Sequence, residues 1–380
     1  MSKDALSPIA GPLDLYNNPL WRPNRPFGAV SDSLRSEEMD QAADVIRSWP
    51  EYRPTPLRSL TGLARRLGLG AVLCKDEALR FGVGGVKALG APYGLEVLLQ
   101  ENAAIVGGPW TTIAATDGNH GLALAWAAGR SGCASLIFVG PDVDAGRLSR
   151  IRGAGAAIEV VDGTYDDAVL AAERRAAADP FALLVTDTDY TGNLAVSRAV
   201  MAGYSLLATE AWEDGLGAQP PSHVFLHCGV GTMAAGITMG LWRLLGSATP
   251  RVVTVEPMAA ACLLASLRAG RPERVEGALT TRMAGLACGR PSLPAWTVLS
   301  KAAFAGMTVA EDTATAVQQE LAVGAYGDPP LLGGDTGIAG LAGLVAAATD
   351  PDARARLGLG PESRVFVVNS EGPSPARPVG

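Results

Sequence analysis

The stretch Arg80–Gly90 (RFGVGGVKALG) places one lysine, Lys87, at the end of a glycine-rich turn and at the start of an apolar helical segment. Glycines allow the backbone to approach a ligand closely, and small apolar neighbours leave the amine poorly hydrated. Poor hydration lowers the pKa of an amine and makes it nucleophilic toward a carbonyl, which suits a Schiff-base lysine. A solvated lysine in the first turn of a helix gives the same local pattern, so this interpretation needs support from other segments.

Around this turn, strand-like and helical segments alternate along the chain. We expect strands near residues 71–76, 110–115, 134–139, 157–161, 182–186, 224–226, 252–255 and 365–368. We expect the main helices near 36–46, 88–99, 122–128, 145–151, 168–178, 197–212, 234–245, 259–267, 293–304, 313–321 and 336–347, after a proline-rich arm of 35 residues. This alternation predicts an α/β fold with parallel sheets covered by helices on both faces, and ligands at the carboxyl ends of the strands.

The composition favours a small-molecule partner. The chain has 380 residues, 48% of them hydrophobic and 18% charged, which is enough for two lobes and a large core. Its net charge is −7 and its basic residues do not cluster, so nucleic acid and anionic membranes are poor candidates for partners. The five cysteines are odd in number and widely spaced, and no segment resembles a signal peptide or a membrane span, so we expect a soluble cytoplasmic protein with reduced cysteines.

The histidines do not suggest a metal site. There are three of them, His120, His223 and His227, and there is no Cys-x-x-Cys motif. His223 and His227 would share one face of a strand, but they lack a third ligand. We therefore predict no metal.

The segment Gly229–Met233 (GVGTM) follows an expected strand and opens an expected helix. Such a turn offers consecutive backbone N–H groups and the positive end of a helix dipole to a phosphate, although an ordinary strand-to-helix turn also uses glycines. The sequence contains no P-loop motif, and this turn lacks the third glycine of a dinucleotide fingerprint. A single phosphate without an adjacent lysine fits pyridoxal phosphate (PLP).

Polar residues follow several other expected strands. Asp117 and Asn119 can cap a helix; alternatively, Asn119 donates to the phenolic oxygen of a cofactor and Asp117 acts as an acid or base. Asp187 ends a strand, as either a turn residue or a catalytic carboxylate. Ser370 ends the last strand, and its neutral hydroxyl beside a pyridine nitrogen would leave that nitrogen unprotonated, which favours elimination over transamination.

In order and spacing, six segments resemble the diaminopropionate ammonia-lyase family over roughly residues 50 to 373. These segments are 80–90, 115–121, 229–236, 255–257, 283–289 and 370–372. The resemblance implies a fold type II, tryptophan-synthase-like PLP enzyme, usually a homodimer, with two lobes of parallel-type sheets flanked by helices and the cofactor in the cleft between them. It also implies a large PLP-binding domain of residues 1–90 and 205–380 and a small domain of residues 91–204.

The resemblance further implies roles for single residues. It makes Lys87 the Schiff-base lysine and places Asn119 at the phenolic oxygen of PLP and Ser370 at its pyridine nitrogen. The implied phosphate site is Gly229, Val230, Gly231, Thr232 and Met233. The implied acidic catalytic pair is Asp117 and Asp187, and the implied substrate site is Thr116, Asp117, Gly118 and His120. The counterpart of Lys87 is the base for the L-isomer, and a carboxylate, most simply Asp117, is the base for the D-isomer.

The implied reaction is the α,β-elimination of 2,3-diaminopropionate, or of a close β-substituted amino acid, to pyruvate and ammonia through an aminoacrylate intermediate. The sequence departs from the family's usual pattern at two places, and both bear on which substrate is used. Val86 stands where the family commonly has Phe, and Gly333–Gly337 (GGDTG) differs from the usual Ser-Gly-Glu-Ser-Gly. The alternatives are a PLP-dependent threonine/serine dehydratase-like or β-replacement enzyme acting on another β-substituted amino acid in a biosynthetic pathway, and a non-catalytic binding protein of the same fold.

Overall fold

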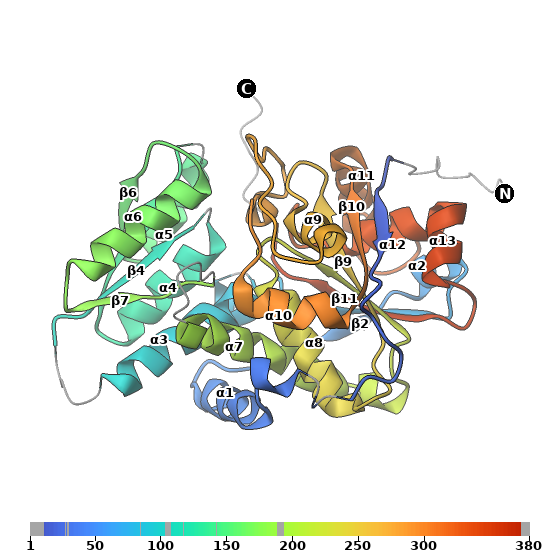
Figure 1. Ribbon diagram of the computed structural model, residues 1–380, viewed down its shortest axis with the longest axis horizontal. Coiled ribbons are helices and arrows are strands. Elements are labelled where there is room, and N and C mark those ends of the chain that lie inside the picture. The colour runs from blue at the N-terminus through green and yellow to red at the C-terminus, as the bar shows by residue number, and fades with distance from the viewer. Residues whose placement is uncertain are drawn as a thin grey trace.

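The computed structural model describes residues 11–373, except residues 27, 29, 84, 103–107, 117, 142 and 188–193. The described residues form two lobes, each built on its own sheet (Figure 1). Within these residues no helix is both long and apolar enough to cross a membrane.

The larger sheet has its strands in the order β1-β10-β9-β8-β11-β3-β2. Their bounds are β1 Leu15–Asn17, β10 Ala303–Val309, β9 Arg251–Pro257, β8 His223–His227, β11 Arg364–Asn369, β3 Ala71–Asp76 and β2 Leu57–Ser59. The inner strands are parallel, as expected, but β1 and β2 pair antiparallel at the two edges. The sequence marked neither edge strand, because each has only three residues and shows no period.

The smaller sheet is parallel throughout, with the order β6-β5-β4-β7. Its strands are β6 Ala157–Val160, β5 Ala134–Val139, β4 Thr111–Ala115 and β7 Ala182–Leu184. Helices α4 (Asn119–Arg130), α5 (Ala145–Gly153) and α6 (Tyr165–Ala177) contact these strands. This sheet confirms the expected alternation of strands and helices in the middle of the chain.

Helices cover both faces of the larger sheet, so its central strands are apolar on both sides. In β11, Phe366 and Val368 belong to one core cluster, while Val365 and Val367 belong to the other. The helices on the first face are α1 Ser36–Ser48, α3 Lys87–Glu101, α7 Leu194–Glu213, α8 Thr232–Leu245 and α10 Leu293–Ala302 (Figure 1). The helices on the second face are α2 Thr61–Leu67, α11 Glu311–Ala322, α12 Ala339–Thr349 and α13 Pro351–Leu357, and α9 Cys262–Ala269 follows β9.

Two helices of the first face, α3 and α7, connect the two lobes. They pack closely because α7 has Gly203 at the contact, where a Cβ atom would lie 2.8 Å from the carbonyl oxygen of Leu89. Because α3 begins with Lys87, this packing fixes the position of the lysine relative to both lobes.

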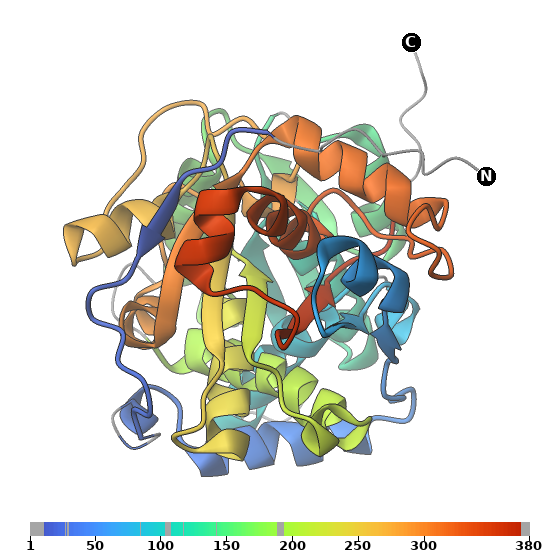
Figure 2. The same cartoon turned by 90° about the vertical axis from the view of Figure 1, so that its right-hand side faces the viewer.

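One expected helix is too long. The helix predicted over 293–304 ends at Ala302, and the chain continues directly into β10, which pairs with β9 and with β1 at the sheet edge (Figure 2). No glycine or proline marks this boundary, so the sequence reads as one apolar segment. The expected domain boundaries at residues 90/91 and 204/205 stay a prediction; α7 runs through residue 204 without a break.

Candidate active site

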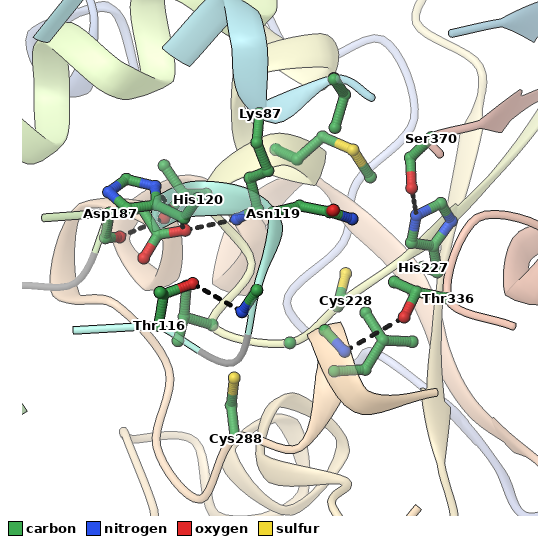
Figure 3. A pocket seen from close by; sticks show the side chains of 18 of the residues that line it. Lys87, Thr116, Asn119, His120, Asp187, His227, Cys228, Cys288, Thr336 and Ser370 are labelled. Atoms are coloured by element: carbon green, nitrogen blue, oxygen red, sulfur yellow. Dashed lines mark hydrogen bonds and ion pairs between the residues drawn. The ribbon is translucent and has the colours of Figure 1, made fainter. Parts of the chain in front are cut away.

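The lysine of the glycine-rich turn forms an ion pair with a carboxylate from the other lobe. Lys87 Nζ donates to Asp187 Oδ2 at 2.5 Å, and the two side chains are 27% and 8% exposed (Figure 3). Asp187 follows β7, at the carboxyl end of the smaller sheet. The pair therefore joins the two lobes at the point where ligands of parallel sheets bind.

The ion pair reverses one expectation. Burial is the largest single effect on the pKa of Lys87 and lowers it, but the charges of Asp187 and Tyr204 and the hydrogen bond to Asp187 together outweigh burial and raise that pKa above its ordinary value. The expectation of a lowered lysine pKa is therefore wrong for this state of the protein. Burial is the largest single effect on the pKa of Asp187 and raises it, but the charge of Lys87 and the hydrogen bond from Lys87, with smaller contributions beside them, together lower it to about 2. Both groups are charged at neutral pH.

One cavity collects the expected site residues. Its empty space, mouth included, is about 870 Å³. The expected residues that line it are Lys87, Thr116, Gly118, Asn119, His120, Asp187, Gly229, Val230, Gly231, Thr232, Met233 and Ser370. Asp117, expected to act in catalysis and substrate binding, lies outside the described residues.

The wall formed by Gly229–Met233 is the N-terminus of α8. Gly231 precedes the helix with a φ of 92°, and the first helical hydrogen bond runs from the Ala235 N–H to the Gly231 carbonyl at 2.9 Å. The N–H groups before Ala235 therefore have no acceptor within the helix. A Cβ atom at Gly229 would lie 2.9 Å from Cys288 Sγ, so glycine is required for this close packing. The result is a cradle suited to one phosphate.

Asn119 has a partner that sequence reasoning missed. Its Nδ2 donates to the carboxylate of Glu371, which is 7% exposed and also accepts from the Thr336 N–H at 3.2 Å. Burial raises the pKa of Glu371. The signal available in the sequence was the position of this acidic residue, two residues after the end of a buried strand. Since Thr336 belongs to the unusual segment Gly333–Gly337, that segment holds Glu371 in place.

Ser370 also has a partner in the cavity wall. His227, at the end of β8, places Nε2 2.7 Å from Ser370 Oγ. His227 is 3% exposed, and burial followed by the nearby charge of Lys87 lowers its pKa to about 3. As a metal ligand His227 lacked partners in the sequence, and among the described residues no cluster of His, Cys, Asp and Glu could hold a metal ion.

Two expected substrate-binding side chains are engaged by the protein itself. His120 Nε2 donates to the Val185 carbonyl at 2.9 Å, and its Nδ1 lies 3.9 Å from Asp187 Oδ2. Burial lowers the pKa of His120, so the ring is neutral. Thr116 Oγ1 accepts from the Gly118 N–H at 2.9 Å and so shapes the turn before α4.

Five further residues line the cavity for which the sequence predicted no role. Arg147 and Tyr165 come from the first turns of α5 and α6, and Cys228, Cys288 and Thr336 come from the larger lobe. Cys288 and Thr336 belong to the segments 283–289 and Gly333–Gly337 noted in the sequence, whereas the helix starts that carry Arg147 and Tyr165 have no distinguishing pattern and only the tertiary fold reveals them.

The residues of the cavity fit PLP as a group. They supply an amine, a helix N-terminus for a phosphate, an amide from the smaller lobe and a hydroxyl from the larger lobe. The turn before Lys87 approaches Ser370 closely: Val86 N–H donates to the Ser370 carbonyl at 2.8 Å, and a Cβ atom at Gly85 would lie 3.0 Å from that oxygen. The lysine and the hydroxyl are thus held in fixed relation.

Comparison with known proteins agrees with this geometry. Residues 49–371 match the family described as "Pyridoxal-phosphate dependent enzyme". The diaminopropionate ammonia-lyase of Salmonella typhimurium is 32% identical over 370 residues, covering 91% of each chain. That of Escherichia coli K12 is 33% identical over 379 residues, covering 95% of this chain and 93% of its own. The chain belongs to the diaminopropionate ammonia-lyase family.

A solved structure of the family shares the whole architecture. The Escherichia coli diaminopropionate ammonia-lyase in complex with an aminoacrylate-PLP azomethine reaction intermediate superimposes with a TM-score of 0.86 at 30% identity, covering 96% of this chain and 94% of its own. The fold type II architecture and the PLP dependence expected from the sequence are confirmed. The roles of single residues stay predictions.

Proposed function

We propose that the chain is a PLP-dependent ammonia-lyase that eliminates the β-amino group of 2,3-diaminopropionate. The α-proton leaves first, the bond between the β-carbon and nitrogen then breaks, and water hydrolyses the remaining enamine. One substrate and one water thereby give pyruvate and two molecules of ammonia. The observation that carries the proposal is the Lys87–Asp187 ion pair in a cavity with a phosphate cradle, in a chain that matches this family over nearly its full length.

The protein contributes binding and orientation. When bound, PLP supplies an electron sink for the negative charge that develops at the substrate's α-carbon. With PLP bound, the N-terminus of α8 would hold its phosphate, Asn119 would donate toward its phenolic oxygen, and Ser370 would face its pyridine nitrogen. The backbone of residues 116–120 binds the substrate carboxylate, which turns the scissile bonds toward Lys87.

Asp187 controls the proton on Lys87. The lysine must lose a proton before it can accept one from the substrate's α-carbon, and the Asp187 carboxylate lies 2.5 Å away as the acceptor. Once Lys87 is uncharged, the interaction that lowers the Asp187 pKa is gone and burial raises it. Asp187 can then hold a proton and deliver it to the departing ammonia. Asp117 completes the proposed acidic pair as the base for the D-isomer.

The test is an assay of the purified, PLP-loaded protein with L- and D-2,3-diaminopropionate, measuring pyruvate and ammonia in the same reaction. We expect both products, and neither with Lys87→Ala. Oxobutyrate from threonine at a higher kcat/KM would instead establish the dehydratase-like alternative. Binding of PLP without any product from these substrates would reject the lyase and leave the β-replacement and binding-protein alternatives.

We also propose that the chain is a cytoplasmic homodimer with a large domain of residues 1–90 and 205–380 and a small domain of residues 91–204. The family resemblance supports the dimer, and the five free cysteines suit a reducing compartment. Light scattering should give a mass near twice 39.0 kDa, and a monomer mass would reject the dimer.

A further inference from the structure

His227 is a buried titratable residue that the chemistry above does not use. It lies at the carboxyl end of β8 and contacts the cavity through Ser370, whose Oγ is 2.7 Å from its Nε2 (Figure 3). A hydroxyl can donate to this nitrogen or accept from it, so the distance alone does not say where the protons are.

The protonation state of the His227 ring follows from its surroundings. Burial and the charge of Lys87 keep His227 neutral at physiological pH, so one of its two ring nitrogens carries a proton. The other histidines are simpler cases. His120 Nε2 and His223 Nε2 face carbonyl oxygens of Val185 and Leu357, which can only accept, so both rings carry their proton on Nε2.

The surroundings of His227 Nδ1 determine which of the two ring nitrogens carries the proton. This nitrogen is buried and has no hydrogen-bond partner among the described residues. It lies against the first turn of α12, since a Cβ atom built on Gly340 would be 3.4 Å from it. A proton on Nδ1 would be an unpartnered buried donor facing the positive end of a helix dipole, whereas a lone pair is favoured there. The proton therefore belongs on Nε2, which donates to Ser370 Oγ.

This tautomer determines what Ser370 presents to the cavity. We propose that His227 is a positioning residue that donates to Ser370 Oγ and so leaves the Ser370 hydroxyl hydrogen free to donate to the pyridine nitrogen of PLP. If His227 accepted instead, the single hydroxyl hydrogen would be used inside the wall and lone pairs would face the cavity. A donor there pairs with an unprotonated pyridine nitrogen. The inference rests on the proposed cofactor role of Ser370.

The first test reads the tautomer directly. The chain has only three histidines, so untagged holoenzyme labelled with ring-¹⁵N histidine gives three ring systems in solid-state NMR. We expect each ring to show a protonated Nε2 and an unprotonated Nδ1, and the His227 signals to disappear in His227→Leu. A protonated Nδ1 on His227 would overturn the proposal whatever the activity of the enzyme.

The second test asks whether His227 acts through Ser370. We expect His227→Leu to weaken PLP binding about five- to tenfold, as the loss of one neutral hydrogen bond would, and to shift the visible absorbance maximum of the substrate-free holoenzyme. In a Ser370→Ala background the same change should weaken binding less than about twofold, because the hydroxyl that it orients is already absent. Equal effects in both backgrounds would overturn the proposal.

The matched control is His223→Leu, which removes a buried histidine from the same face of the same strand but whose ring contacts Ser222 and Leu357 outside the cavity. It should leave the absorbance maximum unchanged; the same shift in His223→Leu would attribute the effect to damage in β8 and reject the role of His227. Absence of a Lys87-dependent absorbance band in the wild-type protein would remove the cofactor assignment, whereas a normal band with unchanged His227→Leu behaviour would remove only this proposal.

Discussion

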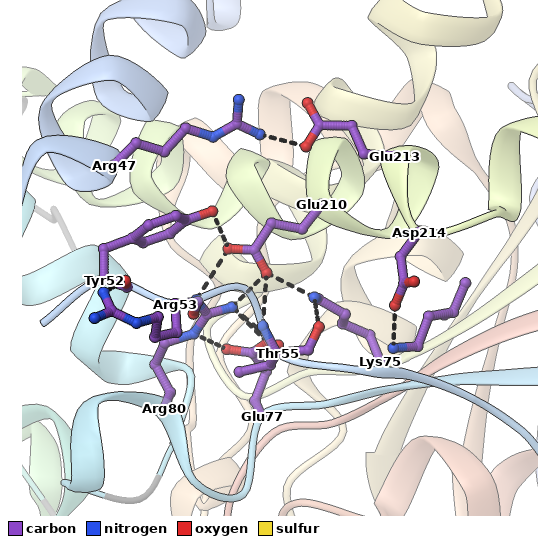
Figure 4. Close-up of polar contacts among 11 residues, drawn as sticks. Arg47, Tyr52, Arg53, Thr55, Lys75, Glu77, Arg80, Glu210, Glu213 and Asp214 are labelled. Atoms are coloured by element: carbon purple, nitrogen blue, oxygen red, sulfur yellow. Dashed lines mark hydrogen bonds and ion pairs between the residues drawn. The ribbon is translucent and has the colours of Figure 1, made fainter.

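Lys75 and Lys87 lie at the two ends of the segment of residues 75–87, and each forms an ion pair with a carboxylate. The two ion pairs differ in their surroundings. Lys75 Nζ lies 2.6 Å from Glu210 Oε2, and both side chains are fully buried. Glu210 also accepts from the Arg80 guanidinium at 2.7 and 2.9 Å and from the Tyr52 hydroxyl at 3.0 Å (Figure 4). The Lys87–Asp187 pair instead faces the cavity, where the lysine is 27% exposed.

This difference in surroundings indicates a structural role for the buried Lys75–Glu210 pair and a chemical role for the Lys87–Asp187 pair at the cavity. Arg80 opens the glycine-rich turn, and its bonds to Glu210 and to Glu77 at 2.7 Å anchor that turn to α7 and to the end of β3. The charges of this buried network compensate one another away from any ligand, which suits a structural role. At the other end of the turn, Lys87 pairs with the carboxylate of Asp187 and has open space beside it, which is what a proton-transferring group requires. Mutations should therefore affect stability at one end and catalysis at the other.

The largest effect should come from Asp187→Asn. Because the amide cannot accept the Lys87 proton or return it to the departing ammonia, we expect kcat for 2,3-diaminopropionate to fall about 10²- to 10⁴-fold. Urea unfolding of the apoprotein at pH 7 should give a free energy at most about 2 kcal/mol below the wild-type value, the size of the pKa shift of Asp187. A variant with wild-type kcat would show that this carboxylate is only a structural partner of Lys87.

Glu210→Gln should instead lower the stability of the protein and leave its kcat almost unchanged. It leaves the fully buried Lys75 ammonium without its carboxylate, so we expect a loss of about 3–5 kcal/mol in the free energy of unfolding by urea, with kcat of the folded enzyme within about threefold of wild type. The control is Glu213→Gln on the same helix, whose 54% exposed carboxylate pairs with Arg47 and should cost less than about 1 kcal/mol. Equal costs for both variants would contradict the structural role assigned to the network.

The Lys87–Asp187 pair should also have a signature in the pH dependence of stability. The folded-state pKa of Asp187 is lowered from 3.8 to about 2, so the unfolded chain takes up this proton first as the pH falls. The contribution, about 2 kcal/mol, is present above pH 3.8 and is lost as the pH falls through about 2. For Lys87, whose pKa is raised, the contribution is present below the ordinary lysine pKa and is lost as the pH rises above it.

The measurement is the difference in unfolding free energy between apo wild type and Asp187→Asn, followed from pH 6 to the lowest pH at which both remain folded. We expect this difference to shrink steadily as the pH falls below 3.8. A difference that stays constant in acid would mean that Asp187 is not held ionised by Lys87.

The sequence predicted those parts of the site whose chemistry is local. The glycine-rich turn with Lys87 and the start of α8 at Gly229–Met233 are both encoded by residues adjacent in the chain, and the cavity contains both. The sign of the Lys87 pKa shift could not be predicted in this way, because its cause, Asp187, is 100 residues away. The partners His227 and Glu371 were missed for the same reason: each acts on a neighbour that only the tertiary fold supplies.

For the fold, periodicity was sufficient where elements are long or bounded by turn residues. Strands β3 and β5 have the bounds that the sequence predicts, because each is a short, mainly apolar segment with a glycine directly before or after it. Strand β10 was lost because α10 runs into it without a glycine or proline. The edge strands β1 and β2 form by pairing with a neighbouring strand. A segment of three residues is too short to show a strand pattern in the sequence on its own.

The smallest effect should come from Tyr52→Phe, which removes one neutral donor from Glu210. Burial, followed by the charge of Glu210, raises the pKa of Tyr52 to about 12, so the hydroxyl is protonated and donates throughout the physiological range. Glu210 keeps its bonds to Lys75 and Arg80, so we expect a loss of about 1 kcal/mol in unfolding free energy and an unchanged kcat.

The control is Tyr326→Phe, which removes a hydrogen bond from Tyr326 to Glu320 on α11, outside the network. It should cost less than about 0.5 kcal/mol in unfolding free energy, because neither Tyr326 nor Glu320 is fully buried. A loss of kcat in Tyr52→Phe without loss of stability would show that the network tunes the Lys87 turn as well as anchoring it, and the division between the two ends of the segment would fail.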